Sequence, residues 1–211
     1  MKYLHLPLSC VLAGAVLTLI VLAMLRPQQQ PAEPAATPSA DAVISNIMTR
    51  TSIRQFTSET LSAEETETLL KAGMAAPSAC NLQPWRYVVV TEDSLRQQIA
   101  GAIHPAAPAA KAPTVIVVCG DMEALFEPGP EYWIEDCSAV CENILLAAHA
   151  LGLGGVWMGV YPQMERCELL RELLQLPATI QPLGMLAIGH PAESPAPKDK
   201  WKPENVHYNK W

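Results

Sequence analysis

One stretch of the chain, residues 133–151, limits the possible folds more than any other because it predicts a long helix that is apolar nearly all round. A helix with so little polar surface is expected to lie at the centre of a domain, buried by its neighbours. Gly152 follows directly and is a typical residue for ending a helix. The rest of the domain therefore has to fold around this helix.

The segments on either side predict both helices and strands. Ser62 and Glu65 form a capping-box pattern at the start of one helix. Because the expected helices and strands do not alternate strictly along the chain, they indicate an α+β fold. The stretch 104–113 reads as a loop. Further helices are expected from Asp41, from residues 93–94 to about 102, and over 165–174; strands are expected at 85–90, 114–120, 155–161 and 182–188.

The N-terminus reads as a separate module. Residues 8–25 carry no charge and would span about 27 Å as a helix, close to the hydrocarbon thickness of a bilayer. We expect an uncleaved transmembrane anchor at residues 1–26, with a cleaved secretory signal as the alternative. Residues 27–40 are rich in Pro, Gln and Ala and predict an extended linker, so the folded domain is expected at residues 41–211.

Composition excludes some functions. A formal net charge of −7 argues against nucleic acid as a partner, because binding phosphates requires clustered Lys and Arg. The six cysteines show no zinc-ligand spacing and do not decide the redox compartment. Cys137 and Cys141 share one helical face, and we interpret both as core packing. No metal site is expected.

The first candidate site segment is Arg50-Thr51-Ser52-Ile53-Arg54. If it is extended, the period of two places Arg50, Ser52 and Arg54 on one face. Two guanidinium groups beside a hydroxyl suit a phosphate dianion. A solvated turn with surface arginines explains the same residues, and the segment alone leaves both interpretations open.

The second segment, residues 76–85, follows a helix that has to end before Pro77. Its small residues would let backbone N–H groups approach a ligand. Asn81 and Gln83 supply amide groups suited to the edge of a planar heterocycle. An ordinary connection between a helix and a strand remains the alternative.

Two further segments are less specific. The glycines of residues 152–159 end a helix and precede a strand, which is the reverse of a dinucleotide-binding turn, so alone they predict a helix cap and a packed strand. In the tail, residues 198–211, Lys200 could meet a phosphate. Trp201 and Trp211 are too apolar to remain in water, so the tail is expected to pack on another surface. Packing on its own domain alone is the alternative.

Taken in order, these segments resemble the nitroreductase family over residues 41–211. The family pattern is an RxSxR motif, a PSAxNxQPW loop, a Gly-rich turn after the central helix and a basic residue near the C-terminus. Matching positions are Arg50, Ser52, Arg54, Pro77, Ser78, Ala79, Asn81, Gln83, Pro84, Trp85, Gly154 and Gly155. Lys200 stands where many members have Arg.

The resemblance implies an α+β homodimer, with a central mixed or antiparallel sheet flanked by helices and FMN bound at the subunit interface. Arg50, Ser52, Arg54 and Lys200 would hold the FMN phosphate. Pro77, Ser78 and Asn81 would lie along the ring, from either subunit, and Gly154 and Gly155 near its reactive edge. The implied cofactor-binding residues are Arg50, Thr51, Ser52, Arg54, Pro77, Ser78, Ala79, Asn81, Gln83, Gly154, Gly155 and Lys200.

The implied function is an FMN-dependent oxidoreductase that passes a hydride from NAD(P)H through FMN to a nitroaromatic, a quinone or a similar small-molecule acceptor. No catalytic side chain is nominated. The alternatives are a flavin-dependent dehalogenase-type enzyme and a membrane-tethered flavin or small-ligand binding protein without turnover. A membrane localisation follows from the expected anchor, and NAD(P)H as donor favours the cytoplasmic side for the domain.

Overall fold

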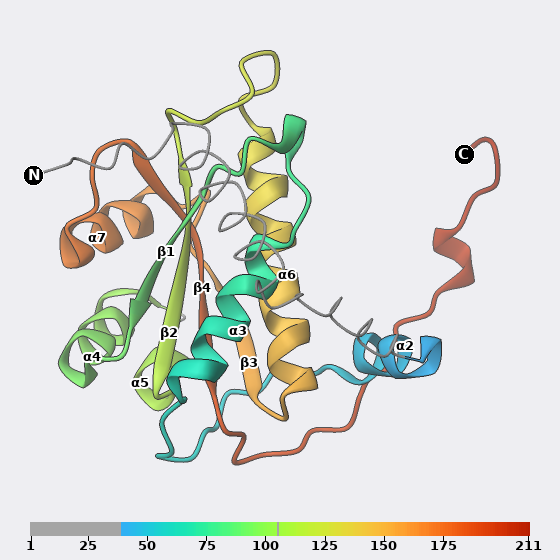
Figure 1. Ribbon diagram of the computed structural model, residues 1–211, viewed down its shortest axis with the longest axis horizontal. Coiled ribbons are helices and arrows are strands. Elements are labelled where there is room, and N and C mark those ends of the chain that lie inside the picture. The colour runs from blue at the N-terminus through green and yellow to red at the C-terminus, as the bar shows by residue number, and fades with distance from the viewer. Residues whose placement is uncertain (1–38, 105) are drawn as a thin grey trace, which may run out of the picture. The chain divides into compact units, whose positions relative to one another are not determined.

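The computed structural model describes residues 39–104 and 106–211, and residues 40–211 form one compact unit. Its centre is a four-stranded antiparallel sheet in the order β1-β2-β4-β3 (Figure 1). The strands are β1 (Trp85–Val90), β2 (Thr114–Asp121), β3 (Gly154–Gly159) and β4 (Ile180–Gly189). The predicted α+β class and the antiparallel form of the sheet are confirmed.

Helices cover both faces of the sheet, with α3 and α6 on one face and α4, α5 and α7 on the other (Figure 1). The helices are α2 (Ala40–Thr49), α3 (Ala63–Met74), α4 (Asp93–Ala102), α5 (Ala107–Lys111), α6 (Tyr132–Ala150) and α7 (Met164–Leu174). Two short 3₁₀ turns, η1 (Ala79–Asn81) and η2 (Pro203–Asn205), complete the described elements.

The core consists of two apolar layers separated by the sheet. Successive residues of β2 point to opposite faces, so Ile116 and Val118 pack under α6 while Val115 and Val117 pack under α4 and α7. All four are fully buried. A strand covered on both faces needs apolar residues at every position, which is why this segment reads as a continuous hydrophobic run.

The long central helix lies where the sequence predicts it. The side chains of Val140, Cys141 and Ile144 in α6 are fully buried between the sheet and α3. Gly152 adopts a φ of 74° just after the helix, a conformation that residues other than glycine rarely take. The core-packing interpretation of Cys137 and Cys141 is confirmed, and burial raises the pKa of the Cys137 thiol to about 12.

One local expectation differs from the structure. Residues 107–111 of the expected loop 104–113 form the short helix α5, with a proline in its first turn, where the missing N–H is not needed. Helix α2 forms as predicted, and its apolar residues Val43, Ile44, Ile47 and Met48 are exposed. A stretch as short as 107–111 has too few residues for its sequence pattern to separate a loop from a short helix.

The expected membrane-spanning helix requires a correction. Within residues 39–104 and 106–211, no helix is long and apolar enough to cross a bilayer. The expected anchor, residues 1–26, and nearly all of the linker 27–40 lie outside the described residues. This finding contradicts the transmembrane part of the predicted fold and the membrane localisation that depended on it.

The capping box of α3 is present as predicted. The Ser62 hydroxyl accepts from the Glu65 N–H at 3.1 Å, and Glu65 Oε2 accepts from the Ser62 N–H at 2.7 Å. The hydrogen bond from the Ser62 backbone lowers the pKa of Glu65 below its ordinary value of 4.5. A carboxylate whose pKa is lowered by folding stabilises the folded state above the unfolded pKa and loses this effect as the pH falls through the folded pKa.

Ser62→Ala is therefore expected to lower the free energy of unfolding by about 1 kcal/mol at pH 7, measured by urea denaturation. Glu65→Gln should also destabilise at pH 7, and its difference from the wild type should shrink as the pH falls below 4.5. Ser58→Ala is the control, since this side chain makes no hydrogen bond in the described part of the chain. Equal stability of Ser62→Ala and the wild type would contradict the capping role.

Candidate functional site

The segment Arg50-Thr51-Ser52-Ile53-Arg54 runs along the outer edge of β3. Ser52 forms a parallel bridge with Gly155, and the Ile53 N–H donates to the Gly155 carbonyl at 3.0 Å. Ile53 is buried, with 7% of its surface exposed, while Ser52 is half-buried and Arg54 exposed. The alternation agrees with the expected extended conformation, in which Ser52 and Arg54 share the side opposite Ile53.

Arg50 lies at a cavity of about 300 Å³ beside this segment. Its guanidinium Nε is 3.6 Å from Glu142 Oε1 on α6, and 18% of its side chain is exposed. Apolar walls and the polar groups of the segment surround the same space. The cavity is lined by Thr49, Arg50, Thr51, Ile53, Leu145, His149, Gly152, Leu153, Gly155, Pro191, Glu193, Ser194, Pro195 and Pro197.

His149 and Thr49 add a second polar group to this cavity. The Thr49 hydroxyl donates to the Ser45 carbonyl at 2.7 Å, so its only proton is already used. His149 Nε2, 2.9 Å from the same hydroxyl oxygen, therefore acts as the donor in that contact. In this arrangement Nε2 of His149 carries a proton.

Close packing leaves no room for a side chain at Gly154 or Gly155. A Cβ on Gly154 would lie 2.7 Å from Ile53 Cγ2, and one on Gly155 would lie 2.8 Å from both Ile188 Cδ1 and Leu145 Cδ2. A larger residue at position 154 would push Ile53, and with it the Arg50–Arg54 segment, away from the sheet, whereas one at position 155 would collide with two core side chains. The structure thus places both glycines beside this segment, and their expected approach to a flavin ring stays a prediction.

The second predicted segment, Pro77 to Gln83, forms a tight loop that ends in β1. Cys80, Asn81 and Gln83 have φ values of 48°, 56° and 53°, a region that non-glycine residues rarely adopt. The Ser78 hydroxyl accepts from the Gln83 N–H at 3.0 Å, and Gln83 Nε2 donates to Asn81 Oδ1 at 3.0 Å. Asn81 and Gln83 are exposed, so the loop presents amide groups to solvent.

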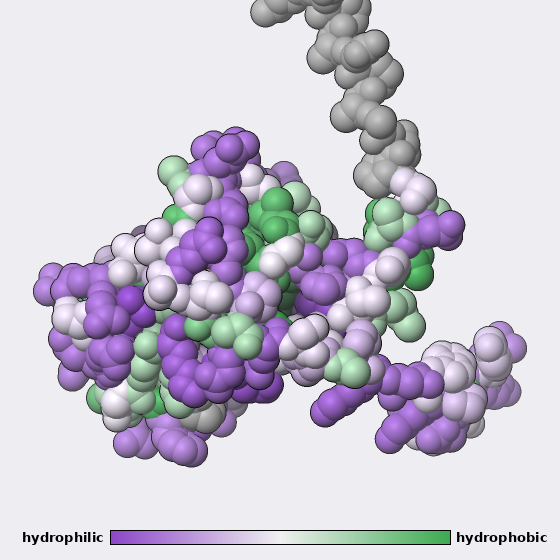
Figure 2. All heavy atoms as spheres, turned by 90° about the horizontal axis from the view of Figure 1, so that it is seen from below, coloured by the Kyte–Doolittle hydropathy of each residue, from purple (hydrophilic) through white to green (hydrophobic). Residues whose placement is uncertain are grey.

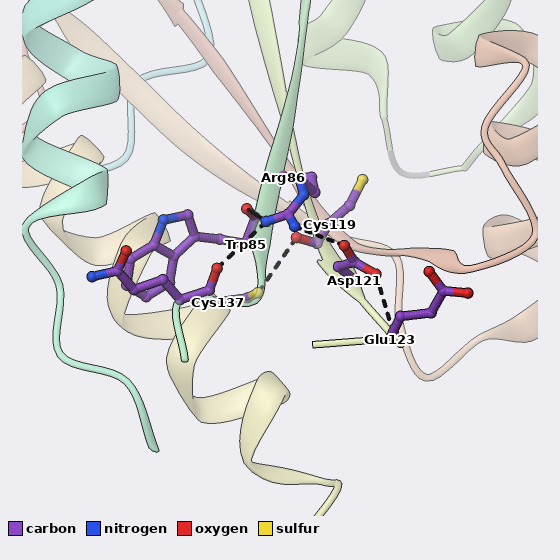
Figure 3. A network of polar contacts seen from close by, with 7 residues as sticks. Trp85, Arg86, Cys119, Asp121, Glu123 and Cys137 are labelled. Atoms are coloured by element: carbon purple, nitrogen blue, oxygen red, sulfur yellow. Dashed lines mark hydrogen bonds and ion pairs between the residues drawn. The ribbon is translucent and has the colours of Figure 1, made fainter. Parts of the chain in front are cut away.

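Two contacts hold this loop on the body of the domain. Asp136 of α6, with 8% of its surface exposed, accepts from the Ala79 N–H at 2.9 Å. At the other end, Arg86 Nη1 donates to the Gln83 carbonyl at 3.4 Å, while Nη2 pairs with Asp121 Oδ2 at 2.7 Å. Figure 3 shows Arg86 reaching from β1 to Asp121 at the end of β2. Such anchors offset the strain of three positive φ values.

The loop and the cavity lie at opposite ends of α6. Asp136, which holds the loop, and His149, which lines the cavity, are thirteen positions apart on this helix, about 20 Å at 1.5 Å per residue. Arg50, Thr51 and Gly155 line the cavity together, and Ser52 and Arg54 adjoin it in the same segment. Lys200 is exposed in the tail and does not line it. One chain therefore does not bring all the predicted residues together.

Four acidic or basic residues of the site were not predicted. They are Asp136, Glu142, His149 and Glu193. A signal existed for Asp136 and Glu142, because carboxylates are unusual in a helix expected to be apolar nearly all round. No sequence signal indicated Glu193, whose neighbours in space are far from it in the chain.

Removal of the Asp136 carboxylate tests its role as loop anchor. Asp136→Ala leaves the Ala79 N–H without its partner, and the free energy of unfolding should fall by about 1–3 kcal/mol. Hydrogen exchange at the Ala79 amide should become faster. Asp136→Asn keeps an acceptor oxygen and should show a smaller effect on both measurements. Unchanged exchange at Ala79 in Asp136→Ala would refute the anchor.

The chain is similar in sequence to known proteins over a region that contains the first three candidate segments. A sequence model of the Nitroreductase family matches residues 47–126 and 109–190, together more than half of the chain. The chain is 39% identical over 170 residues to a protein of Methanothermobacter thermautotrophicus provisionally named NADH dehydrogenase/NAD(P)H nitroreductase. This match covers 80% of the chain and 87% of the relative.

Solved structures have the same fold. A protein of the same provisional name from Bacteroides thetaiotaomicron superimposes with a TM-score of 0.77 at 38% identity, covering 81% of this chain and 98% of the other. A provisionally named nitroreductase from Desulfovibrio desulfuricans, solved in complex with FMN, gives a TM-score of 0.69 at 32% identity. That match covers 80% of this chain and 97% of the other.

Proposed function

Because the chain belongs to the nitroreductase family, we propose that it is an FMN-dependent oxidoreductase that uses NAD(P)H as electron donor and reduces nitroaromatic, quinone or similar acceptors. The observation that carries this proposal is the cavity beside Arg50, which combines a cation, hydroxyl groups and apolar walls. FMN when bound supplies the chemistry, since it accepts a hydride and passes reducing equivalents on.

The residues of the cavity fit the phosphate end of FMN. Arg50 offers a guanidinium with several donors, and Thr51 adds a hydroxyl at the same space. Ser52 and Arg54 lie next to it in the same extended segment. Leu145 and Leu153 provide apolar walls, and a volume of about 300 Å³ lies at the lower end of small-molecule sites. The role of this chain is thus to bind and orient the cofactor.

The loop Pro77–Gln83 fits the ring end of FMN. Asn81 and Gln83 offer amide donors and acceptors at the surface. The small side chains at Pro77, Ser78 and Ala79 would let a planar ring approach the backbone closely. The anchors at Asp136 and Arg86 keep these groups in place before a ligand arrives. No acid or base of this chain is needed in this proposal.

A homodimer would unite the two halves of the site. The loop and the cavity of one chain are separated along α6 by about 20 Å, so a second copy could place its loop over the cavity of the first. Helix α2 supports this, because it has no buried residue and Met48 is 67% exposed. Hydrophobic residues are visible on the surface at α2 (Figure 2).

The C-terminal tail gives further support for a homodimer. Trp201, Tyr208 and Trp211 are 70%, 84% and 99% exposed, although large aromatic side chains favour burial. Lys200 in the same tail could reach the phosphate of FMN once the tail lies on a second copy. An exposed set of apolar residues on α2 and the tail is typical of a surface that another protein covers.

FMN binding is tested by an absorption spectrum of the full chain. Flavin bands should bleach when NADH or NADPH is added in anaerobic buffer. Arg50→Ala should weaken FMN affinity by about tenfold or more, because a charge-assisted contact to phosphate is lost. Lys71→Ala, which removes an exposed cation from α3, is the control and should leave FMN affinity unchanged. A chain that cannot be loaded with FMN would overturn the proposed function.

The homodimer is tested by sedimentation of variants of α2. Ile44→Asp places a charge on the exposed apolar side and should shift the chain toward monomer by about tenfold or more in dissociation constant. FMN retention should fall together with the dimer, since the site would lose the loop of the second copy. Ser45→Asp introduces the same charge at the neighbouring exposed position and should have a smaller effect. A wild-type chain that binds FMN as a monomer would contradict the shared site.

A further inference from the structure

The backbone that carries Ser52 and Arg54 is fastened to the chain leaving β4. The Thr57 N–H donates to the His190 carbonyl at 2.9 Å, and the Ala192 N–H donates to the Gln55 carbonyl at 2.9 Å. Phe56 forms an antiparallel bridge with Pro191 between them. The two segments thus pair like strands up to residue 192, where regular pairing ends.

The side chain of Glu193 continues the attachment where backbone pairing ends. Glu193 Oε1 accepts from the Arg54 N–H at 2.5 Å and from the Gln55 N–H at 3.1 Å. Two consecutive amides that converge on one oxygen form an anion-binding arrangement, and the negative charge strengthens both hydrogen bonds. Neither amide has another partner in the described part of the chain.

The position of Glu193 is unusual for a phosphate site. The residue lines the same cavity as Arg50 and His149, where its charge would repel a phosphate dianion. A carboxylate at this place weakens phosphate binding, so its presence indicates a second role for the side chain. Its two hydrogen bonds identify that other role, because they fix the backbone from which the Arg54 side chain projects and to which Ser52 is linked through Ile53.

We propose that Glu193 is a positioning residue for the FMN phosphate, acting through the Arg54 and Gln55 amides without touching the phosphate itself. The inference rests on the proposed function. The positioning role requires the hydrogen-bond acceptor of the Glu193 side chain but does not require its negative charge. Replacement by glutamine therefore preserves the segment, while replacement by alanine releases it.

The test compares FMN with riboflavin, which lacks the phosphate, in fluorescence titrations of the full chain. Glu193→Ala should weaken FMN affinity by about tenfold and change riboflavin affinity by less than about twofold. Glu193→Gln should stay within about threefold of the wild type for both ligands. In the ligand-free protein, the Arg54 and Gln55 amides should exchange faster in Glu193→Ala than in Glu193→Gln. Glu172→Ala, an exposed carboxylate of α7, controls for net charge.

Other outcomes overturn the inference in distinguishable ways. Tighter FMN binding in both variants would show that repulsion by the carboxylate outweighs positioning. Equal losses for FMN and riboflavin would show a general structural role. In one outcome the wild type binds FMN more tightly than riboflavin, Arg50→Ala loses this preference and Glu193→Ala keeps it. That outcome refutes the role of Glu193 and leaves the proposed phosphate site standing. If the wild type does not distinguish FMN from riboflavin, the proposed phosphate site fails and this inference fails with it.

Discussion

Burial of α6 against the sheet is the interaction on which both halves of the candidate site depend. The helix packs its apolar residues on β2 and β4, which fixes its position and its rotation about its own axis. Its few polar residues are then placed by the same packing. Asp136 near one end reaches the Ala79 amide, and Glu142 and His149 toward the other end meet the Arg50 side of the domain.

The outer edge of β3 has a comparable role for the Arg50–Arg54 segment. An open strand edge has unpaired backbone groups, and here Ser52 and Ile53 cover part of them. Contact this close requires that Gly154 has no side chain, because a Cβ would collide with Ile53. The chain leaving β4 holds the residues that directly follow the segment, through hydrogen bonds at Gln55 and Thr57. A short sequence without regular structure of its own is thereby kept extended.

The sequence predicted the elements more completely than the site. The periodicity of residues 114–120 and 133–151 identified a buried strand and a central helix, because burial on all sides leaves a pattern in the residues themselves. The first three candidate segments have the expected local structure, as an extended segment, a loop between α3 and β1, and a turn between α6 and β3. The tail was expected to pack, yet Trp201 and Trp211 are exposed, and the roles of all four segments toward FMN stay predictions. The contribution of Glu193 was not foreseen, since a hydrogen bond between positions 139 residues apart leaves no local pattern.

The sequence by itself determined the α+β class, the central helix and the four candidate segments, because these depend on local propensity and on the spacing of apolar residues. Tertiary structure alone decided which segments meet. It joined Ser52 to Gly155 and Arg54 to Glu193, separated the Pro77–Gln83 loop from the Arg50 cavity, and left the apolar side of α2 exposed. The physical reason is that such contacts are set by how whole elements pack, and packing depends on shape and volume across the domain.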